Sequence, residues 1–166
     1  VDKNANIIDI GGGDSKLADK LLELGFKNIS VLDISAKALE KAKTRLREKG
    51  KSVIYIEADI LEFDAGSRFD IWHDRATFHF LTKEKDIVRY VEIAGKFIKS
   101  SGYLIISTFS TNGPKKCSGL DIMQYSEDSI KKTFQKDFSH MRSFEEIHTT
   151  PFNTKQNFLF NVFKRK

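Results

Sequence analysis

The sequence predicts an α/β domain of three layers, in which a mostly parallel sheet lies between two layers of helices. Two observations support this fold class. Short apolar segments rich in β-branched residues alternate along the chain with segments whose apolar residues recur at helical spacing. Two later segments alternate apolar and polar residues around a short turn, as an antiparallel hairpin does. We therefore expect seven strands, the last two forming a C-terminal hairpin at the sheet edge.

The strands are expected where apolar runs are short and bounded by turn residues. They cover residues 6–10, 28–34, 52–57, 69–74, 103–109, 141–149 and 156–164. A turn at residues 151–153 separates the last two. Residues 110–125 show no periodicity and predict a long loop of the kind that often carries function.

Four helices are expected between these strands. Their apolar positions are three or four residues apart: Leu17, Leu21 and Leu24; Leu39, Ala42 and Leu46; Ile87, Val91, Ala94 and Ile98; and Ile130 and Phe134. Ser35, Thr82 and Ser126 can cap the last three helices at their N-termini. Gly25 and Gly50 can end the first two.

Length and composition fit one globular domain. The 166 residues are 40% hydrophobic and 31% charged, which is typical of folded proteins and not of disordered chains. Cys117 is the single cysteine, so no internal disulfide can form, and we expect a reducing, cytoplasmic setting. No apolar run approaches the roughly 18 residues that a membrane helix needs, so no membrane partner is expected.

The net charge of +5 has local sources. One predicted helix and the segment after it carry a run of basic residues: Lys37, Lys41, Lys43, Arg45, Arg47, Lys49 and Lys51. Three more basic residues, 164–166, close the chain. A solvated helix face is the favoured explanation, and contact with an acidic protein is the alternative. Because no aromatic residues are interleaved in the run, a nucleic-acid partner is not expected.

A glycine turn follows the first strand. Gly11, Gly12 and Gly13 come directly after it, and consecutive glycines let the backbone approach a ligand closely. Such a turn alone is a weak signal, because a tight strand–helix corner can also need glycine. A second acid strengthens it: Asp33 ends the second strand about 20 residues further on, where a carboxylate accepts hydrogen bonds from both ribose hydroxyls of a nucleoside cofactor.

The residues around the turn distinguish between two kinds of cofactor. The dinucleotide fingerprint has a third glycine where this chain has Lys16. Asp9 and Asp14 would also lie unfavourably beside a pyrophosphate, whereas a carboxylate near an ammonium or sulfonium group is electrostatically favourable. The sequence therefore favours S-adenosylmethionine, whose product is S-adenosylhomocysteine. A nucleotide-dependent oxidoreductase is the remaining alternative.

Residues 9–15, Asp-Ile-Gly-Gly-Gly-Asp-Ser, resemble motif I of the class I S-adenosylmethionine-dependent methyltransferases, Asp-x-Gly-x-Gly-x-Gly. The resemblance spans nearly the whole chain and implies one Rossmann-like domain over residues 1–166 with strand order 3-2-1-4-5-7-6. It implies cofactor contacts for these residues: Asp9, Gly11, Gly12, Gly13, Asp33, Ile34, Asp59, Ile60 and Asp74. Among them, Asp33 would bind the ribose, Ile34 would cover the adenine, and Asp59 would accept from its amino group. Since the first strand begins almost at Val1, we expect the N-terminal segment that forms a lid in this family to be missing.

A second motif follows the fourth strand. Asp74-Arg75-Ala76 is similar to the Asp-Arg-Gly of the thiopurine methyltransferase family and to the Asp-Lys-Gly of certain protein-lysine methyltransferases. The resemblance implies that Asp74 contacts the methionine part of the cofactor and that Arg75 lies where cofactor and acceptor meet. A strand-end acid that caps the next helix is the alternative for Asp74. Because these relatives use different acceptors, the motif does not select a substrate.

Methyl transfer from a sulfonium is an in-line displacement, so positioning and desolvation can supply most of the acceleration and a general base is optional. His79 is the candidate base, because a histidine titrates near neutral pH. The alternative is a buried histidine that fills space between Phe78 and Phe80. The other histidines have no partners at metal-ligand spacing, so no metal is expected.

We therefore expect a methyltransferase that acts on a small-molecule nucleophile. Methylation of protein lysine is the alternative within the same class of enzyme. A non-catalytic subunit that binds S-adenosylmethionine is the alternative outside it. The sequence gives no indication of the oligomeric state.

Overall fold

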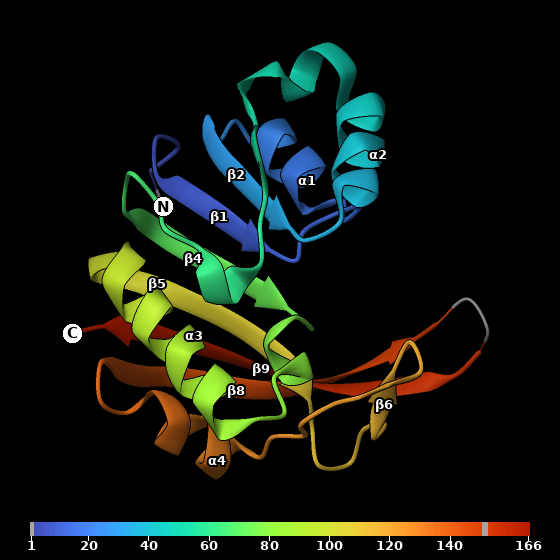
Figure 1. The fold of residues 1–166 in the computed structure, drawn as a ribbon, viewed down its shortest axis with the longest axis vertical. Helices are drawn as coiled ribbons and strands as arrows, with labels where there is room; N and C mark the ends of the chain where they lie inside the picture. The colour runs from blue at the N-terminus through green and yellow to red at the C-terminus, as the bar shows by residue number, and fades with distance from the viewer. Residues whose placement is uncertain (1, 151–152) are drawn as a thin grey trace.

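A seven-stranded sheet runs through the protein (Figure 1). The computed structural model describes residues 2–150 and 153–166. The strands of this sheet are β1 (Asn6–Ile10), β2 (Asn28–Asp33), β3 (Ile54–Glu57), β4 (Phe69–Arg75), β5 (Ile98–Phe109), β8 (Phe138–Thr149) and β9 (Lys155–Arg165). Their order is β3-β2-β1-β4-β5-β9-β8. The first five are parallel, and β9 runs antiparallel to both of its neighbours. The predicted order and C-terminal hairpin are confirmed.

Helices cover both faces of this sheet. They are α1 (Leu17–Glu23), α2 (Ala36–Leu46), α3 (Glu84–Phe97) and α4 (Glu127–Phe134), with short 3-10 helices at η1 (Arg47–Ser52), η2 (Ile60–Glu62) and η3 (Phe78–Phe80). On β2, Val31 packs with α1 and α2, whereas its neighbour Leu32 belongs to the cluster that contains α3 and α4. Because successive side chains of a strand point to opposite faces, the two helix pairs form two separate layers. The three-layer prediction is confirmed.

Two of the predicted caps form as expected. The Ser35 side chain accepts a hydrogen bond from the backbone N–H of Ala38, and Ser126 accepts one from Ser129 in a capping box. Gly25 ends the first helix with φ +84°. Helix α1 differs from its predicted pattern, because Ala18 is its buried residue while Leu24 is 61% exposed.

The junction between α3 and β5 differs from the prediction. Lys83, not Thr82, precedes the first turn of α3, and no side chain caps it. Ile98 is the first residue of β5 and not part of the helical stripe. The β4–β5 register shifts before Ile71 pairs with Tyr103, so an irregularity within β5 lies just before the expected strand start at residue 103. This shift interrupts the alternation that would have revealed the longer strand.

The C-terminal third also contains more strand than predicted. Residues 110–125 include a small hairpin of β6 (Lys116–Cys117) and β7 (Leu120–Asp121), which is too short to show periodicity. Strand β8 begins at Phe138, three residues early, because a register shift between His140 and Arg142 interrupts the alternation. The predicted turn at 151–153 falls mostly outside the described residues. Of the helices in the described ranges, none combines the length and the apolar character needed to span a bilayer.

Candidate functional site

The glycine turn after β1 leaves no room for side chains. A Cβ at Gly11 would overlap the hydroxyl of Thr77, and one at Gly13 would lie 2.5 Å from Oδ2 of Asp33. A Cβ at Gly12 would be equally close to the carboxylate of Asp9. The φ of Gly11 is +63°, in the left-handed region that favours glycine. The three glycines are therefore required by close contacts, and bare backbone faces the space above the turn.

Asp9 lies beneath this turn and not in the cleft above it. Its side chain is 3% exposed, and its two carboxylate oxygens are both engaged. Ser15 Oγ donates to Oδ2 at 2.9 Å, and Nδ1 of His73 lies 2.7 Å from Oδ1. Asp9 thus connects Ser15, at the glycine turn, with His73 of β4. The cofactor contact that the family resemblance implies for Asp9 stays a prediction.

Arg45 of α2 holds the outer side of the turn. Its guanidinium donates to the Asp19 carboxylate at 2.9 and 3.0 Å and to the Ser15 carbonyl at 2.7 Å, and it also pairs with Asp14. The hydrogen bond from Arg45 is the main reason that the pKa of Asp19 is lowered. The sequence predicts a solvated position for Arg45 among many basic residues, because only the fold brings α2 beside the turn.

An open cleft of about 400 Å³ lies at the carboxyl ends of the parallel strands. It is lined by Gly11, Leu32, Asp33, Ile34, Ala58, Asp59, Ile60, Arg75, Ala76, Thr77, Phe80 and Leu81. Five of the residues expected to contact a cofactor from β1, β2 and the segment after β3 are therefore brought together, as the rule for parallel sheets requires. Gly12 and Gly13 are buried behind Gly11.

The two acids of the cleft are held by neighbouring backbone. Asp33 Oδ1 accepts from the N–H of Ser35 at 2.8 Å, while its other oxygen faces the glycine turn. Asp59 Oδ1 accepts from the N–H of Leu61 at 2.9 Å and caps η2. The second oxygen of each carboxylate has no hydrogen-bond partner in the described part of the chain. Ile34 is 71% exposed at the open side of the cleft.

Asp74 has the alternative role that the sequence left open. It is fully buried and accepts from the N–H groups of Thr77 at 2.9 Å and Phe78 at 3.1 Å. The hydroxyl of Tyr90 also donates to it at 2.6 Å and in turn accepts from Trp72 Nε1. Burial raises the pKa of Asp74 to about 6. Asp74 thus positions the segment after β4 and is not among the residues that line the cleft; its contact with the methionine part of a cofactor stays a prediction.

Arg75 and Ala76 lie at the mouth of the cleft. The Arg75 guanidinium is 5.2 Å from the ring centre of Phe158 on β9, which fixes it by a cation–π contact. Ala76 has φ +66°, and a side chain in this region carries backbone strain of the kind that gathers at functional sites. Thr77 Oγ1 donates to the carbonyl of Ile10 at 3.2 Å. The sequence indicates this segment through Asp74 and Arg75 but carries no signal for the tight turn itself.

His79 lies in the interior. Its ring packs against Phe80 and Phe109 with centroid distances of 4.7 and 4.8 Å, and the residue has no exposed surface. The N–H of Phe109 donates to Nδ1 at 3.4 Å. Burial lowers the pKa of His79 to about 4. The buried ring is of the kind that the space-filling alternative describes, and a role of His79 as a base stays a prediction.

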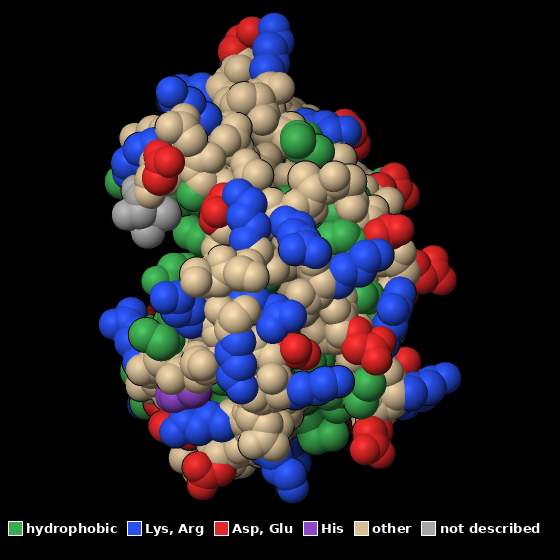
Figure 2. Space-filling model, turned by 90° about the vertical axis from the view of Figure 1, so that its left-hand side faces the viewer, with side chains coloured by type: hydrophobic (Ala, Val, Ile, Leu, Met, Phe, Trp, Pro, Cys, Tyr) green, Lys and Arg blue, Asp and Glu red, His purple; other side chains and the backbone are tan. Residues whose placement is uncertain are grey.

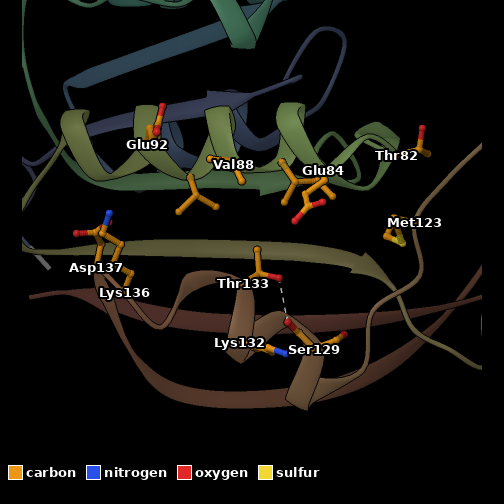
Figure 3. Close-up of a pocket in the computed structure, with 12 residues that line it drawn as sticks. Thr82, Glu84, Val88, Glu92, Met123, Ser129, Lys132, Thr133, Lys136 and Asp137 are labelled. Carbon is orange, nitrogen blue, oxygen red and sulfur yellow. Dashed lines mark hydrogen bonds between the residues drawn. The ribbon is translucent and has the colours of Figure 1, made fainter.

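A second cavity of about 620 Å³ lies between α3 and α4, on the outer surface of the helix layer (Figure 3). Val88 of α3 and Thr133 of α4 point into it from opposite sides, and Met123 lies at one end. None of the residues expected from the sequence to act in catalysis or cofactor binding lines this cavity. Within residues 2–150 and 153–166, no group of three metal-ligating side chains gathers.

The sheet order, the glycine turn and the cleft at the strand ends define a class I methyltransferase fold. A family model described as "Methyltransferase domain" matches residues 1–160. The chain belongs to this family, in which S-adenosylmethionine is the methyl donor.

Similar proteins differ in their acceptors. The human protein named EEF1A lysine methyltransferase 2 is 27% identical over 112 residues, which are 63% of this chain and 48% of that protein. A ubiquinone biosynthesis O-methyltransferase of Thiobacillus denitrificans is 29% identical over 108 residues, 64% of this chain and 45% of the relative. The chain thus spans about half the length of the curated relatives it matches.

Solved structures share the fold at low identity. The 1,6-didemethyltoxoflavin-N1-methyltransferase of Burkholderia thailandensis, solved with S-adenosylhomocysteine, superposes with a TM-score of 0.79 at 17% identity. The match covers 98% of this chain and 72% of that one.

Proposed function

We propose that this domain transfers the methyl group of S-adenosylmethionine to a small-molecule nucleophile. The observation that supports the proposal is one cleft whose lining includes the glycine turn, two carboxylates and an exposed arginine. The acids suit one end of the cofactor, because Asp33 and Asp59 each keep an oxygen for hydroxyl or amino donors.

The residues of the cleft fit the parts of this cofactor. Gly11 offers close backbone contact, Asp33 would accept from the ribose hydroxyls, and Asp59 from the adenine amino group. Ile34 and Ile60 would pack against the adenine faces. When bound, the cofactor supplies an activated methyl group on a positively charged sulfur.

The acceptor side is formed by the segment after β4. Arg75, held over Phe158, would bind an anionic or electron-rich part of the acceptor and orient it. Phe80 and Leu81 line the same cleft and would exclude water from the reacting atoms. Because His79 is buried, we propose that positioning, and not a protein base, supplies the acceleration, with Asp74 holding the turn that presents Arg75.

The resemblance of Asp74-Arg75-Ala76 to the thiopurine methyltransferase family agrees with a small acceptor. Membership of that family stays a prediction. Two relatives point to different acceptors by their names, one a protein lysine and the other a ubiquinone precursor. Protein-lysine methylation is therefore the second candidate.

Transfer of labelled methyl groups separates the candidates. The protein and radiolabelled S-adenosylmethionine are incubated with cell extract, and the products are divided into small molecules and protein bands. The proposal predicts label in the small-molecule fraction that is absent with the Asp33→Ala variant. Label confined to a protein band would establish the second candidate instead. Cofactor binding without transfer to either fraction would contradict both and indicate a non-catalytic subunit.

A further inference from the structure

Strand β8 is a long strand at the open edge of the sheet. It has 12 residues, about twice the usual strand length, and it pairs with β9 on one side. In the described ranges no strand pairs with its other side, because β8 ends the strand order. Figure 1 shows β8 along the lower border of the sheet. An edge of this kind presents unpaired backbone N–H and C=O groups that can accept a further strand.

Three of the exposed side chains of β8 are apolar. Met141 is 56% exposed, Phe144 is 42% exposed and Ile147 is 61% exposed. Phe144 stacks on Phe160 of β9 with a centroid distance of 5.0 Å and an interplanar angle of 4°. The aromatic ring at the middle of the strand is therefore held in one orientation before any partner binds.

Charges of opposite sign flank Phe144 on the same face. Arg142, Phe144 and Glu146 lie opposite Val162, Phe160 and Phe158 of β9, so all three point to one side of the sheet. The Arg142 guanidinium lies 5.6 Å from the ring centre of Phe144. No ion pair within the described part of the chain includes Arg142 or Glu146.

This pattern is complementary to itself when the strand is turned around. In an antiparallel pair of β8 strands centred on Phe144, Arg142 of each copy lies opposite Glu146 of the other. The same register places the two Phe144 rings opposite each other. A centre one residue away would put Glu145 opposite Glu145, or Ser143 opposite Ser143, and would lose both Arg–Glu pairs.

We propose that two copies of this chain associate through β8 and join their sheets into one continuous sheet. The two-fold axis passes beside Phe144, so the contact uses the same surface on both copies and closes as a dimer. Strand pairing satisfies the edge backbone, and the two Arg142–Glu146 pairs fix the register. The inference concerns the edge of the sheet and does not depend on the reaction at the cleft.

Charge reversal provides the test. Sedimentation equilibrium over a range of protein concentrations should show a monomer–dimer equilibrium for the native chain. Arg142→Glu and Glu146→Arg each place like charges opposite, so each should weaken dimerisation roughly tenfold or more. The double variant with both changes restores opposite charges and should return the dimerisation constant to near the native value. Glu48→Arg, a matched change on η1, should leave it unchanged.

Restoration by the double variant excludes misfolding as the cause of the loss. A second readout is hydrogen exchange, in which those amides of residues 142–148 that do not already bond to β9 should become protected as the protein concentration rises. A chain that stays monomeric at all concentrations would overturn the proposal. So would single variants that dimerise like the native chain, or a double variant that stays as weak as the single ones. Failure of S-adenosylhomocysteine to bind would leave the dimerisation result intact and would count only against the proposed function.

Discussion

Asp74 and His79 are buried on either side of the turn after β4, and burial shifts their pKa values in opposite directions. The pKa of Asp74 rises from 3.8 to about 6, so the folded protein holds this proton more tightly than the unfolded chain. Asp74 therefore lowers the free energy of unfolding as pH rises from about 4 to about 6. The pKa of His79 falls from 6.5 to about 4, so the unfolded chain binds this proton more tightly than the folded protein. His79 therefore lowers the free energy of unfolding as pH falls from about 6.5 to about 4.

Between pH 4 and 6 the two contributions oppose each other, and single variants should separate them. Relative to the native chain, Asp74→Asn should gain stability as pH rises from 4 to 6, by up to about 3 kcal/mol. His79→Gln should gain stability as pH falls from 6.5 to 4. Urea unfolding at several pH values measures both differences. A difference that is constant with pH would contradict the burial of that residue.

The sequence is informative about single residues where a strand end fixes their place. Asp33 ends β2 and Asp59 follows β3, and parallel strand ends meet at one rim, so both could be placed in the cleft. Asp74 also lies near the end of a strand, but its burial depends on Tyr90 of α3, which lies 16 residues further along the chain. The environment of His79 likewise depends on Phe109 at the end of β5. Contacts between residues this far apart in the chain leave no pattern in the local sequence.

Among the elements, the glycine turn carries the sharpest steric requirement. In Gly11→Ala the added Cβ would overlap Thr77, and the residue would keep a strained φ. We expect the free energy of unfolding to fall by about 1–3 kcal/mol and the affinity for S-adenosylhomocysteine to fall roughly tenfold or more. Gly25→Ala is the matched control, since its φ is also positive but nothing lies within 4 Å of the added Cβ. It should cost about 1 kcal/mol and leave the affinity unchanged. Chemical unfolding and calorimetric titration measure the two effects. Equal losses of affinity would show that the overlap is not responsible.

Helix α2 acts on the same turn through Arg45. Arg45→Lys keeps the charge but cannot reproduce the forked contacts with Asp19 and the Ser15 carbonyl. We expect an affinity for S-adenosylhomocysteine that is roughly threefold to tenfold lower. Lys41→Ala on the exposed side of the same helix should bind like the native chain. If the two variants bind equally well, the turn does not need the guanidinium.

Element boundaries could be predicted where caps act and not where irregularities occur. Ser35 and Ser126 mark helix starts by a local bond that the sequence reveals. The early start of β5 at Ile98 and of β8 at Phe138 is hidden by register shifts, because each shift breaks the alternation on which strand prediction rests.

At the scale of the whole molecule, the distribution of charge agrees with a cleft for a cationic ligand. Figure 2 views the side on which the parallel strands begin, and Lys and Arg side chains are more numerous there than Asp and Glu. The cleft lies at the opposite ends of the strands and contains two acids, Asp33 and Asp59, against one cation, Arg75. A net charge of +5 therefore does not prevent a sulfonium cofactor from approaching the cleft.

The order of the sheet could be predicted as a whole because the glycine turn, the acids after the strands and the terminal hairpin all agree with one fold. The cavity between α3 and α4 could not be predicted from the sequence, because its width depends on how the two helices pack. The self-complementary charges of β8 have no meaning in the sequence alone, because only the fold makes β8 the edge strand.

The most direct test of the central claim is a calorimetric titration of the native chain and of Asp33→Ala with S-adenosylhomocysteine. The cleft predicts one site per chain in the native protein. It also predicts an affinity roughly 10- to 100-fold lower in the variant, because hydrogen bonds from the ribose to a carboxylate are lost. Asp64→Ala, which removes an exposed acid outside the cleft, should bind normally. Absence of binding by the native chain, or equal affinity in Asp33→Ala, would contradict the account.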